Sequence, residues 1–119
     1  MKVKNYRDVK AEPIIGETGV MFRWLSEELA EPSDCGLYLY EIEPGAFSIP
    51  QTHYRERQVF VLAGTGTVRG AGRESPLGVG DVVCVPPTES HQFVNSGQEM
   101  LRLLVVFQMP RLVTLAGPV

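Results

Sequence analysis

Turn-forming residues interrupt this chain so often that only short segments of regular structure fit between them. Twelve glycines and nine prolines are spread over 119 residues, and both residue types favour turns. The intervening segments are rich in β-branched and aromatic residues, which is typical of strands. The expected strands are Val20–Leu25, Gly36–Glu43, Phe47–His53, Gln58–Leu62, Thr67–Arg69, Glu74–Leu77, Val82–Val85, Ser90–Asn95 and Glu99–Gln108. Eight or nine short strands without a convincing amphipathic helix predict an all-β sandwich or barrel.

Local sequence also predicts how some of these strands connect. The turn Gly70–Arg73 is expected to close a hairpin between the two runs that flank it, and Ser96–Gln98 would most simply close another between the last two strands. Val82–Val85 is apolar throughout and predicts a buried strand in which Cys84 fills space. Ser26–Asp34 is polar and acidic, and we expect a loop or a short helical turn there.

The size and composition of the chain limit its possible partners. With 119 residues, the chain is expected to form one domain over 1–119. A net charge of −3 and the lack of any Lys/Arg run argue against a nucleic-acid partner. The longest apolar run, Leu103–Phe107, is far too short to span a bilayer, so no membrane association is expected.

The N-terminus and the cysteines predict the compartment. Met1–Lys10 lacks the features of a secretory segment. Cys35 and Cys84 lie far apart and form no C-x-x-C unit, so we interpret both as reduced thiols. These features predict a cytoplasmic protein.

A first stretch of regularly spaced residues begins at a proline–glycine turn. Gly45 is followed after five residues by Gln51-Thr52-His53, then by Arg57, and six residues later by Gly64. This spacing resembles the first motif of the cupin family, which is Gly, five residues, His-x-His, three or four residues, Glu, six residues, Gly. The apolar run and glycine turn that end the stretch are also similar to the family pattern.

A second stretch lies further along the chain. Gly80 is followed by Pro86, Thr88, His91 and Asn95. This series resembles the second cupin motif, which is Gly, five residues, Pro-x-Gly, two residues, His, three residues, Asn. The spacing is kept in both motifs, and Thr88 stands where the family usually has glycine. Both motifs in register make the resemblance specific.

The resemblance implies a single-domain cupin of the small conserved-barrel type. Its fold would be an all-β jelly-roll β-barrel, or double-stranded β-helix, with motif one at 45–66 and motif two at 80–95. An N-terminal strand segment at 1–25 and an apolar C-terminal tail at 108–119 would flank the barrel. The resemblance also implies a homodimer and a divalent transition metal held by residues of the two motifs.

The ligand positions depart from the family pattern. Strand alternation places Gln51 and His53 on one face, and the family pattern adds Arg57 and His91 to the same interior. Two imidazoles suit Zn, Ni, Fe, Mn or Cu, and Gln51 would be a weak third ligand. Arg57 stands in place of the acid and cannot lose its proton to become a ligand. A guanidinium about 5 Å from a dication would repel it by about 6 kcal/mol. We therefore expect an absent or weakly held metal.

Arg57 has three possible roles. It could turn to the rim and pair with Glu56 or Glu89, or it could form an internal ion pair with a glutamate. Alternatively, its planar fork could bind the carboxylate or phosphate of a ligand.

These alternatives lead to two main hypotheses for function. The first is an internal pocket that binds a small anionic molecule through Gln51, His53, Arg57 and His91, with or without a weakly held metal. The second is a metal-dependent cupin enzyme (an isomerase, lyase, cyclase or oxygenase) that uses His53, His91 and Gln51. A sensor that works with a separate DNA-binding chain is a third interpretation, because this chain contains no DNA-binding helix pair. The substrate cannot be derived from the fold, since the same barrel hosts many unrelated functions.

Overall fold

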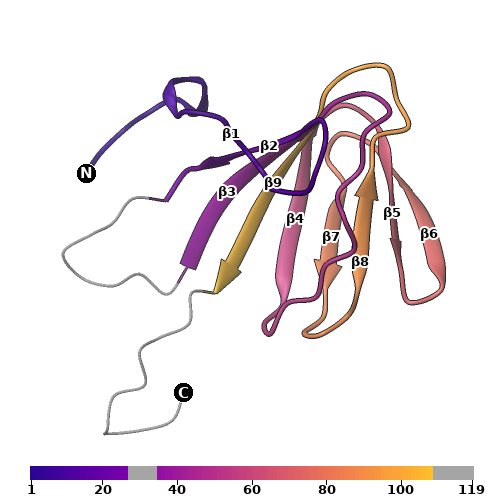
Figure 1. Ribbon diagram of the computed structural model, residues 1–119. Coiled ribbons are helices and arrows are strands. Elements are labelled where there is room, and N and C mark those ends of the chain that lie inside the picture. Colours follow the sequence, from indigo (N-terminus) through magenta and orange to yellow (C-terminus); the bar gives the residue numbers. More distant parts are fainter. Residues whose placement is uncertain (27–34, 109–119) are drawn as a thin grey trace, which may run out of the picture.

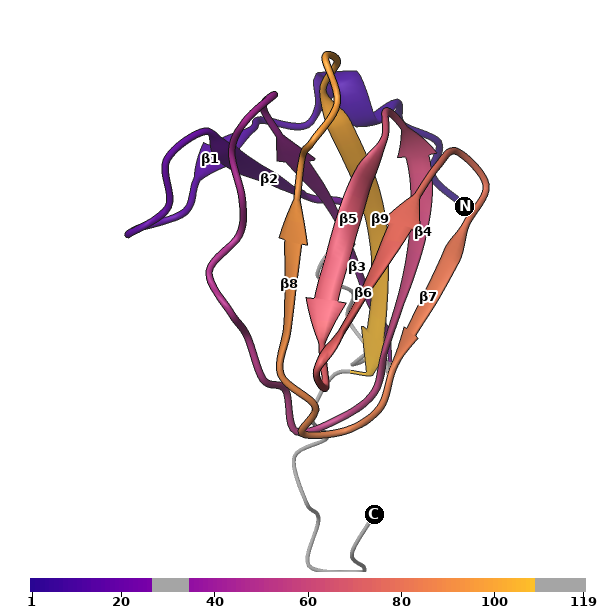
Figure 2. The same cartoon turned by 90° about the vertical axis from the view of Figure 1, so that its right-hand side faces the viewer.

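Two antiparallel β-sheets form the body of the protein in a computed structural model that describes residues 1–26 and 35–108 (Figure 1). The larger sheet has the strand order β1-β2-β3-β9-β4-β7 and the smaller has the order β6-β5-β8. The strands are β1 (Glu12–Pro13), β2 (Val20–Trp24), β3 (Cys35–Ile42), β4 (Arg57–Ala63), β5 (Gly66–Gly70), β6 (Arg73–Leu77), β7 (Val82–Val85), β8 (His91–Val94) and β9 (Leu101–Gln108). Turned by 90°, the molecule shows β5, β6 and β8 lying in front of strands of the larger sheet (Figure 2).

The all-β jelly-roll fold predicted from the sequence is confirmed. In the described ranges the only helical segment is a single 3-10 turn, η1 (Tyr6–Asp8), and no helix there is long and apolar enough to cross a membrane. The hairpin expected around Gly70–Arg73 is present, with β5 and β6 paired antiparallel. The loop expected at Ser26–Asp34 and the apolar tail at 108–119 lie, except for Ser26 and Gln108, outside the described residues.

The pairing expected for the last two strands is wrong. β8 and β9 do not form a hairpin, because β8 pairs with β5 in the smaller sheet while β9 lies between β3 and β4 in the larger one. The turn between them carries the chain from one sheet to the other. Asn95, which is 1% exposed, fixes this crossing: its Nδ2 donates to the Ile42 and Glu99 carbonyls at 2.7 Å each, and its Oδ1 accepts from Gly97 N. The turn composition alone carries no signal for a change of sheet.

The burial expected for Val82–Val85 is also wrong for most of the strand. β7 lies at the edge of the larger sheet, so its side chains alternate between the interior and solvent. Val85 is buried, whereas Val82 is 56% exposed and Cys84 is exposed rather than filling the core. A run of apolar residues could not distinguish a central strand from an edge strand.

The core forms between the two sheets from alternating strand residues. Within β4 and β9 every second side chain is buried, as strand geometry requires. The buried hydrophobic cluster comprises Val20, Tyr40, Ile42, Val59, Val61, Leu77, Phe93, Leu101, Leu103 and Val105. The segment from Phe47 to Gln51 lies along the free edge of β8 in the smaller sheet, where isolated bridges join Phe47 to Val94 and Gln51 to His91. These bridges bring the first motif beside the second.

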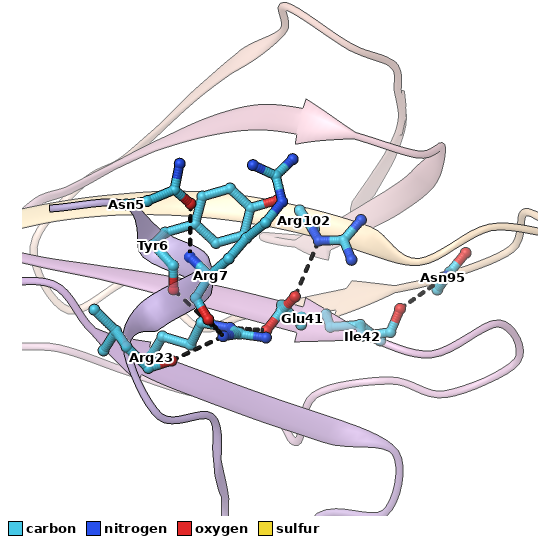
Figure 3. Close-up of polar contacts among 9 residues, drawn as sticks. Asn5, Tyr6, Arg7, Arg23, Glu41, Ile42, Asn95 and Arg102 are labelled. Atoms are coloured by element: carbon cyan, nitrogen blue, oxygen red, sulfur yellow. Dashed lines mark hydrogen bonds and ion pairs between the residues drawn. The ribbon is translucent and has the colours of Figure 1, made fainter.

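A buried ion cluster attaches the N-terminal segment to the outer face of the larger sheet (Figure 3). Glu41, only 4% exposed, accepts from Arg23 Nε at 2.5 Å and from Arg102 Nε at 2.9 Å. Arg23 Nη1 also donates to the backbone carbonyls of Tyr6, Arg7 and Val9. Both guanidinium groups therefore contact the same carboxylate, and the backbone of the first turn is part of the network.

Candidate functional site

The four residues expected at the site come together in the barrel interior. The rings of His53 and His91 lie 5.2 Å apart between centroids. Gln51 pairs with His91 through two backbone hydrogen bonds of 2.9 and 3.0 Å, and its side chain contacts His53. Arg57, the first residue of β4, contacts His53 from the other side. The two motifs thus meet at one place, although ligand binding there stays a prediction.

Arg57 points inward, which decides among the orientations left open by the sequence. Its Nη2 donates to His53 Nδ1 at 2.9 Å, and its guanidinium carbon lies 4.4 Å from the centre of the Phe107 ring. Gly36 makes room for that ring, since a Cβ there would lie 2.3 Å from Phe107 Cζ. Across the described part of the chain, no ion pair involves Arg57, and its Nε is buried without a partner. The pairing with Glu56, Glu89 or an internal glutamate is therefore not formed.

His53 is held as a neutral imidazole with a defined tautomer. Arginine can only donate, so His53 Nδ1 must accept from Arg57. The ring proton then lies on Nε2, which donates to Gln51 Oε1 at 3.2 Å. Burial, the nearby Arg57 charge and His91 together lower the pKa of His53 to about 4. At neutral pH His53 therefore carries no charge.

His91 presents the opposite arrangement. It is 4% exposed, and its Nδ1 donates to the backbone carbonyl of Glu89 at 3.1 Å. In the neutral ring Nε2 is then left as an acceptor. Of the two histidines, His91 is the one that can accept a proton or a hydrogen bond from a ligand.

The loop before His91 is held to the first motif by Thr88. Thr88 has a φ of 67°, a conformation that glycine adopts more easily than a β-branched residue. Its N–H donates to the His53 carbonyl at 2.7 Å. Thr88 thus has a backbone conformation that favours glycine, the residue usual at this position in the family pattern.

Three residues near the site were not identified from the sequence. Tyr40 accepts a hydrogen bond from Gln51 Nε2 at 2.7 Å, and Tyr38 stacks edge-on against Tyr40. Burial raises the pKa of both phenols. Glu17 comes from the turn before β2, where its Oε1 accepts from Ile49 N at 2.6 Å. Tyr38 and Tyr40 lie on a strand predicted correctly, but Glu17 precedes both motifs and no local pattern marks it.

A hollow of about 280 Å³ opens beside this cluster, between the β5–β6 hairpin and β7. Val68, Val83 and Val85 provide its apolar surface, and His91 is the one residue of the predicted four that reaches it. Its charged lining residues are Arg73, Glu89 and Arg69, which pairs with Glu74. His91 therefore stands between the hollow and His53.

The sequence matches a known protein family. The cupin domain family matches residues 38–107, which is more than half of the chain. The chain belongs to the cupin domain family. No curated protein matches it.

Solved cupin structures share the architecture of this chain. The polyketide cyclase RemF from Streptomyces resistomycificus is 28% identical, with a TM-score of 0.81 over 92% of this chain and 82% of that one. A predicted oxalate decarboxylase from Thermotoga maritima is 24% identical, with a TM-score of 0.80 over 92% of this chain and 100% of that one. A cupin 2 conserved barrel domain protein from Rhodopseudomonas palustris is 24% identical, with a TM-score of 0.76 over 87% and 74% of the two chains. The last two likenesses establish the fold alone.

The donor set of this cupin does not suit a tightly held divalent metal. Both ring nitrogens of His53 are engaged, one by Arg57 and the other by Gln51 Oε1. Over the described ranges, no three His, Cys, Asp or Glu side chains form a group that could hold a metal. The guanidinium also stands where the family has an acid, and it would repel a dication. The arrangement disfavours the predicted metal set of His53, His91 and Gln51.

Proposed function

We propose that this cupin domain binds a small anionic molecule in its interior, with Arg57 supplying the positive charge. The observation that carries the proposal is the unbalanced charge of Arg57. The guanidinium is half-buried, contacts a neutral imidazole and an aromatic ring, and leaves Nε buried without a partner. A cation removed from water requires a counter-charge or hydrogen-bond acceptors. A ligand carboxylate or phosphate would supply both through the fork of the guanidinium.

The surrounding residues support an anion at this place. Because His53 is neutral and accepts from Arg57, it keeps the guanidinium oriented without cancelling its charge. The hollow beside His91 supports a pocket large enough for a small molecule. Gln51 holds His53 and Tyr40 in position.

Calorimetric titration with butyrate and its neutral amide tests this proposal. We expect butyrate to bind and the amide to bind much more weakly. Arg57→Gln should weaken butyrate binding by roughly tenfold or more, because a charge-assisted hydrogen bond is lost. Arg55→Gln is the matched control, since it removes the same charge from a residue whose side chain bonds to Gln108 instead. Equal butyrate affinity in wild type and Arg57→Gln would overturn the proposal.

A cyclase is the second candidate function. The likeness to the polyketide cyclase, 28% identity over 92% of this chain, favours it. The acceptor Nε2 of His91, whose Nδ1 donates to the Glu89 carbonyl, could serve as a base there. Metal analysis of protein purified without chelators distinguishes a metal-dependent cyclase from the metal-free binding site. A near-stoichiometric metal that disappears in His53→Ala or His91→Ala would favour the enzyme over the metal-free binding site.

The homodimer expected from the sequence is supported by one face of the larger sheet. Phe60 and Val82 are cross-strand neighbours and are 40% and 56% exposed. Exposed Leu62 and Val106 also lie on β4 and β9. Light scattering should give twice the chain mass for wild type and the chain mass for Phe60→Lys. A monomeric wild-type protein at micromolar concentration would contradict the dimer.

The cytoplasmic location stays a prediction from the sequence.

A further inference from the structure

Two buried side-chain polar atoms lack a hydrogen-bond partner within the part of the chain that the structure describes. They are Arg57 Nε and Glu17 Oε2. The first can only donate and the second, when ionised, can only accept. Buried polar groups are nearly always paired, so each such atom requires an explanation. Here the two atoms have complementary chemistry.

A path of hydrogen bonds, interrupted by the short backbone stretch from Ile49 to Gln51, joins the two residues. Glu17 Oε1 accepts from Ile49 N at 2.6 Å, and the chain reaches Gln51 two residues later. Gln51 Oε1 accepts from His53 Nε2 at 3.2 Å, and His53 Nδ1 accepts from Arg57 at 2.9 Å. The path thus has a carboxylate at one end and a guanidinium at the other, and each end keeps one unused buried atom.

Two phenols lie beside this path. Tyr40 accepts from Gln51 Nε2 at 2.7 Å, and Tyr38 packs edge-on against Tyr40. Tyr38 also packs against Phe107, the ring beside the Arg57 guanidinium. Burial raises the pKa of both phenols; Glu17 also raises both values and Arg57 opposes the rise. In the described ranges no ion pair joins Glu17 and Arg57.

We propose that the ligand of this site is a small anion that also carries a hydroxyl or amine donor, with the anion on Arg57 and the donor on Glu17 Oε2. The proposal rests on the proposed function and adds a second contact to it. A simple carboxylate would satisfy Arg57 but would leave the Glu17 oxygen without a partner. A hydroxy acid or an amino acid satisfies both, and Glu17 becomes a specificity-determining residue.

Matched four-carbon acids test the second contact by calorimetry. Butyrate is compared with 2-, 3- and 4-hydroxybutyrate and with 2-, 3- and 4-aminobutyrate, so that the donor is placed at increasing distance from the carboxylate. In wild type we expect one isomer in at least one series to bind about tenfold more tightly than butyrate, as one added hydrogen bond to a charged group would give. Glu17→Leu should reduce this preference, measured as the ratio to butyrate affinity in the same variant, to less than twofold.

A second variant controls for a structural effect of the substitution, because Glu17→Leu also removes the acceptor for Ile49 N. Glu17→Gln keeps an acceptor for that N–H and removes only the charge. It should lose the preference for an aminobutyrate and retain part of the preference for a hydroxybutyrate. Equal binding of all seven acids in wild type, or a donor preference that survives both Glu17 variants, would overturn the inference.

The two proposals fail in different ways. If butyrate binding is insensitive to Arg57→Gln, the anion site itself is wrong and the inference fails with it. If butyrate binding depends on Arg57 but no donor preference exists, the anion site stands and the role of Glu17 alone is refuted.

Discussion

Two arginine-containing clusters in this cupin differ in whether a carboxylate contacts the guanidinium. On the outer face of the larger sheet, Arg23 and Arg102 share the buried carboxylate of Glu41, and Arg23 also donates to three backbone carbonyls (Figure 3). In the interior, Arg57 contacts a neutral histidine and an aromatic ring. The outer arginines have a carboxylate partner, whereas Arg57 has none in the described ranges.

The difference separates a structural role from a binding role. A satisfied ion cluster stabilises the position of the segments that it joins, here the N-terminal turn on β2, β3 and β9. An unsatisfied cation in the interior costs stability, because no protein group compensates for its desolvation. Such a cost is common at sites that bind ligands. Mutation can test this comparison, since removal of a charge should have opposite consequences in the two clusters.

The largest effect is expected at Glu41. Glu41→Ala leaves two partly buried guanidinium groups without a counter-charge, and breaking a buried ion pair in this way costs about 3–5 kcal/mol. Urea unfolding measures this loss. Glu74→Ala is the control, because the exposed Arg69–Glu74 pair should contribute no more than about 1 kcal/mol. Equal losses in the two variants would contradict the structural role of the outer cluster.

A change of Arg57 to histidine should convert the interior into a better metal site. Arg57→His removes the repelling charge, frees His53 Nδ1 and adds an imidazole, so affinity for Zn²⁺ or Ni²⁺ should rise by roughly a hundredfold or more. Metal titration measures the change, with the double variant Arg57→His/His91→Ala as control. If Arg57→His leaves metal affinity unchanged, the charge of Arg57 is not what weakens the site.

Replacement of Arg57 by an apolar residue should spare stability while it removes binding. Arg57→Met keeps the contact with Phe107 and eliminates the unbalanced charge, and exchanges of buried charge for apolar groups are often neutral or stabilising by about 1 kcal/mol or more. Urea unfolding and butyrate titration on the same preparation measure both effects. A loss of stability as large as that of Glu41→Ala would show that Arg57 is a structural residue.

The smallest effect is expected from pH. The pKa of His53 is about 4 in the folded protein and has an ordinary value of 6.5, so between these values the unfolded chain binds a proton that the folded chain does not. The contribution of His53 to stability is therefore complete above about pH 6.5 and decreases as the pH falls toward 4. Thermal unfolding from pH 7 to pH 4.5 should show a smaller decrease for His53→Asn than for wild type. Identical decreases would contradict the depressed pKa.

The sequence predicted the fold and the meeting of the two motifs, because both depend on spacing along the chain. Turn residues marked most strands, and the motif register placed His53 and His91 in one interior. Strand alternation correctly placed Gln51 with His53.

The remaining features depend on contacts between distant segments. The orientation of Arg57 depends on Phe107 and on the space left by Gly36, both far from it in sequence. Glu17 reaches the site through a contact with Ile49, 32 residues away, and no motif includes it. The crossing from β8 to β9 was missed because its turn residues suit a hairpin equally well.

The central claim is that Arg57 makes this cupin interior a site for an anion and not for a metal. Long-range ¹H–¹⁵N NMR spectra of the two histidine rings at pH 7 test it most directly, with one equivalent of Zn²⁺ added to one sample and butyrate titrated into another. The account predicts that His53 keeps its proton on Nε2 and that butyrate shifts its signals saturably, while Zn²⁺ leaves both rings unchanged. Stoichiometric shifts of both histidines with Zn²⁺, and none with butyrate, would contradict it.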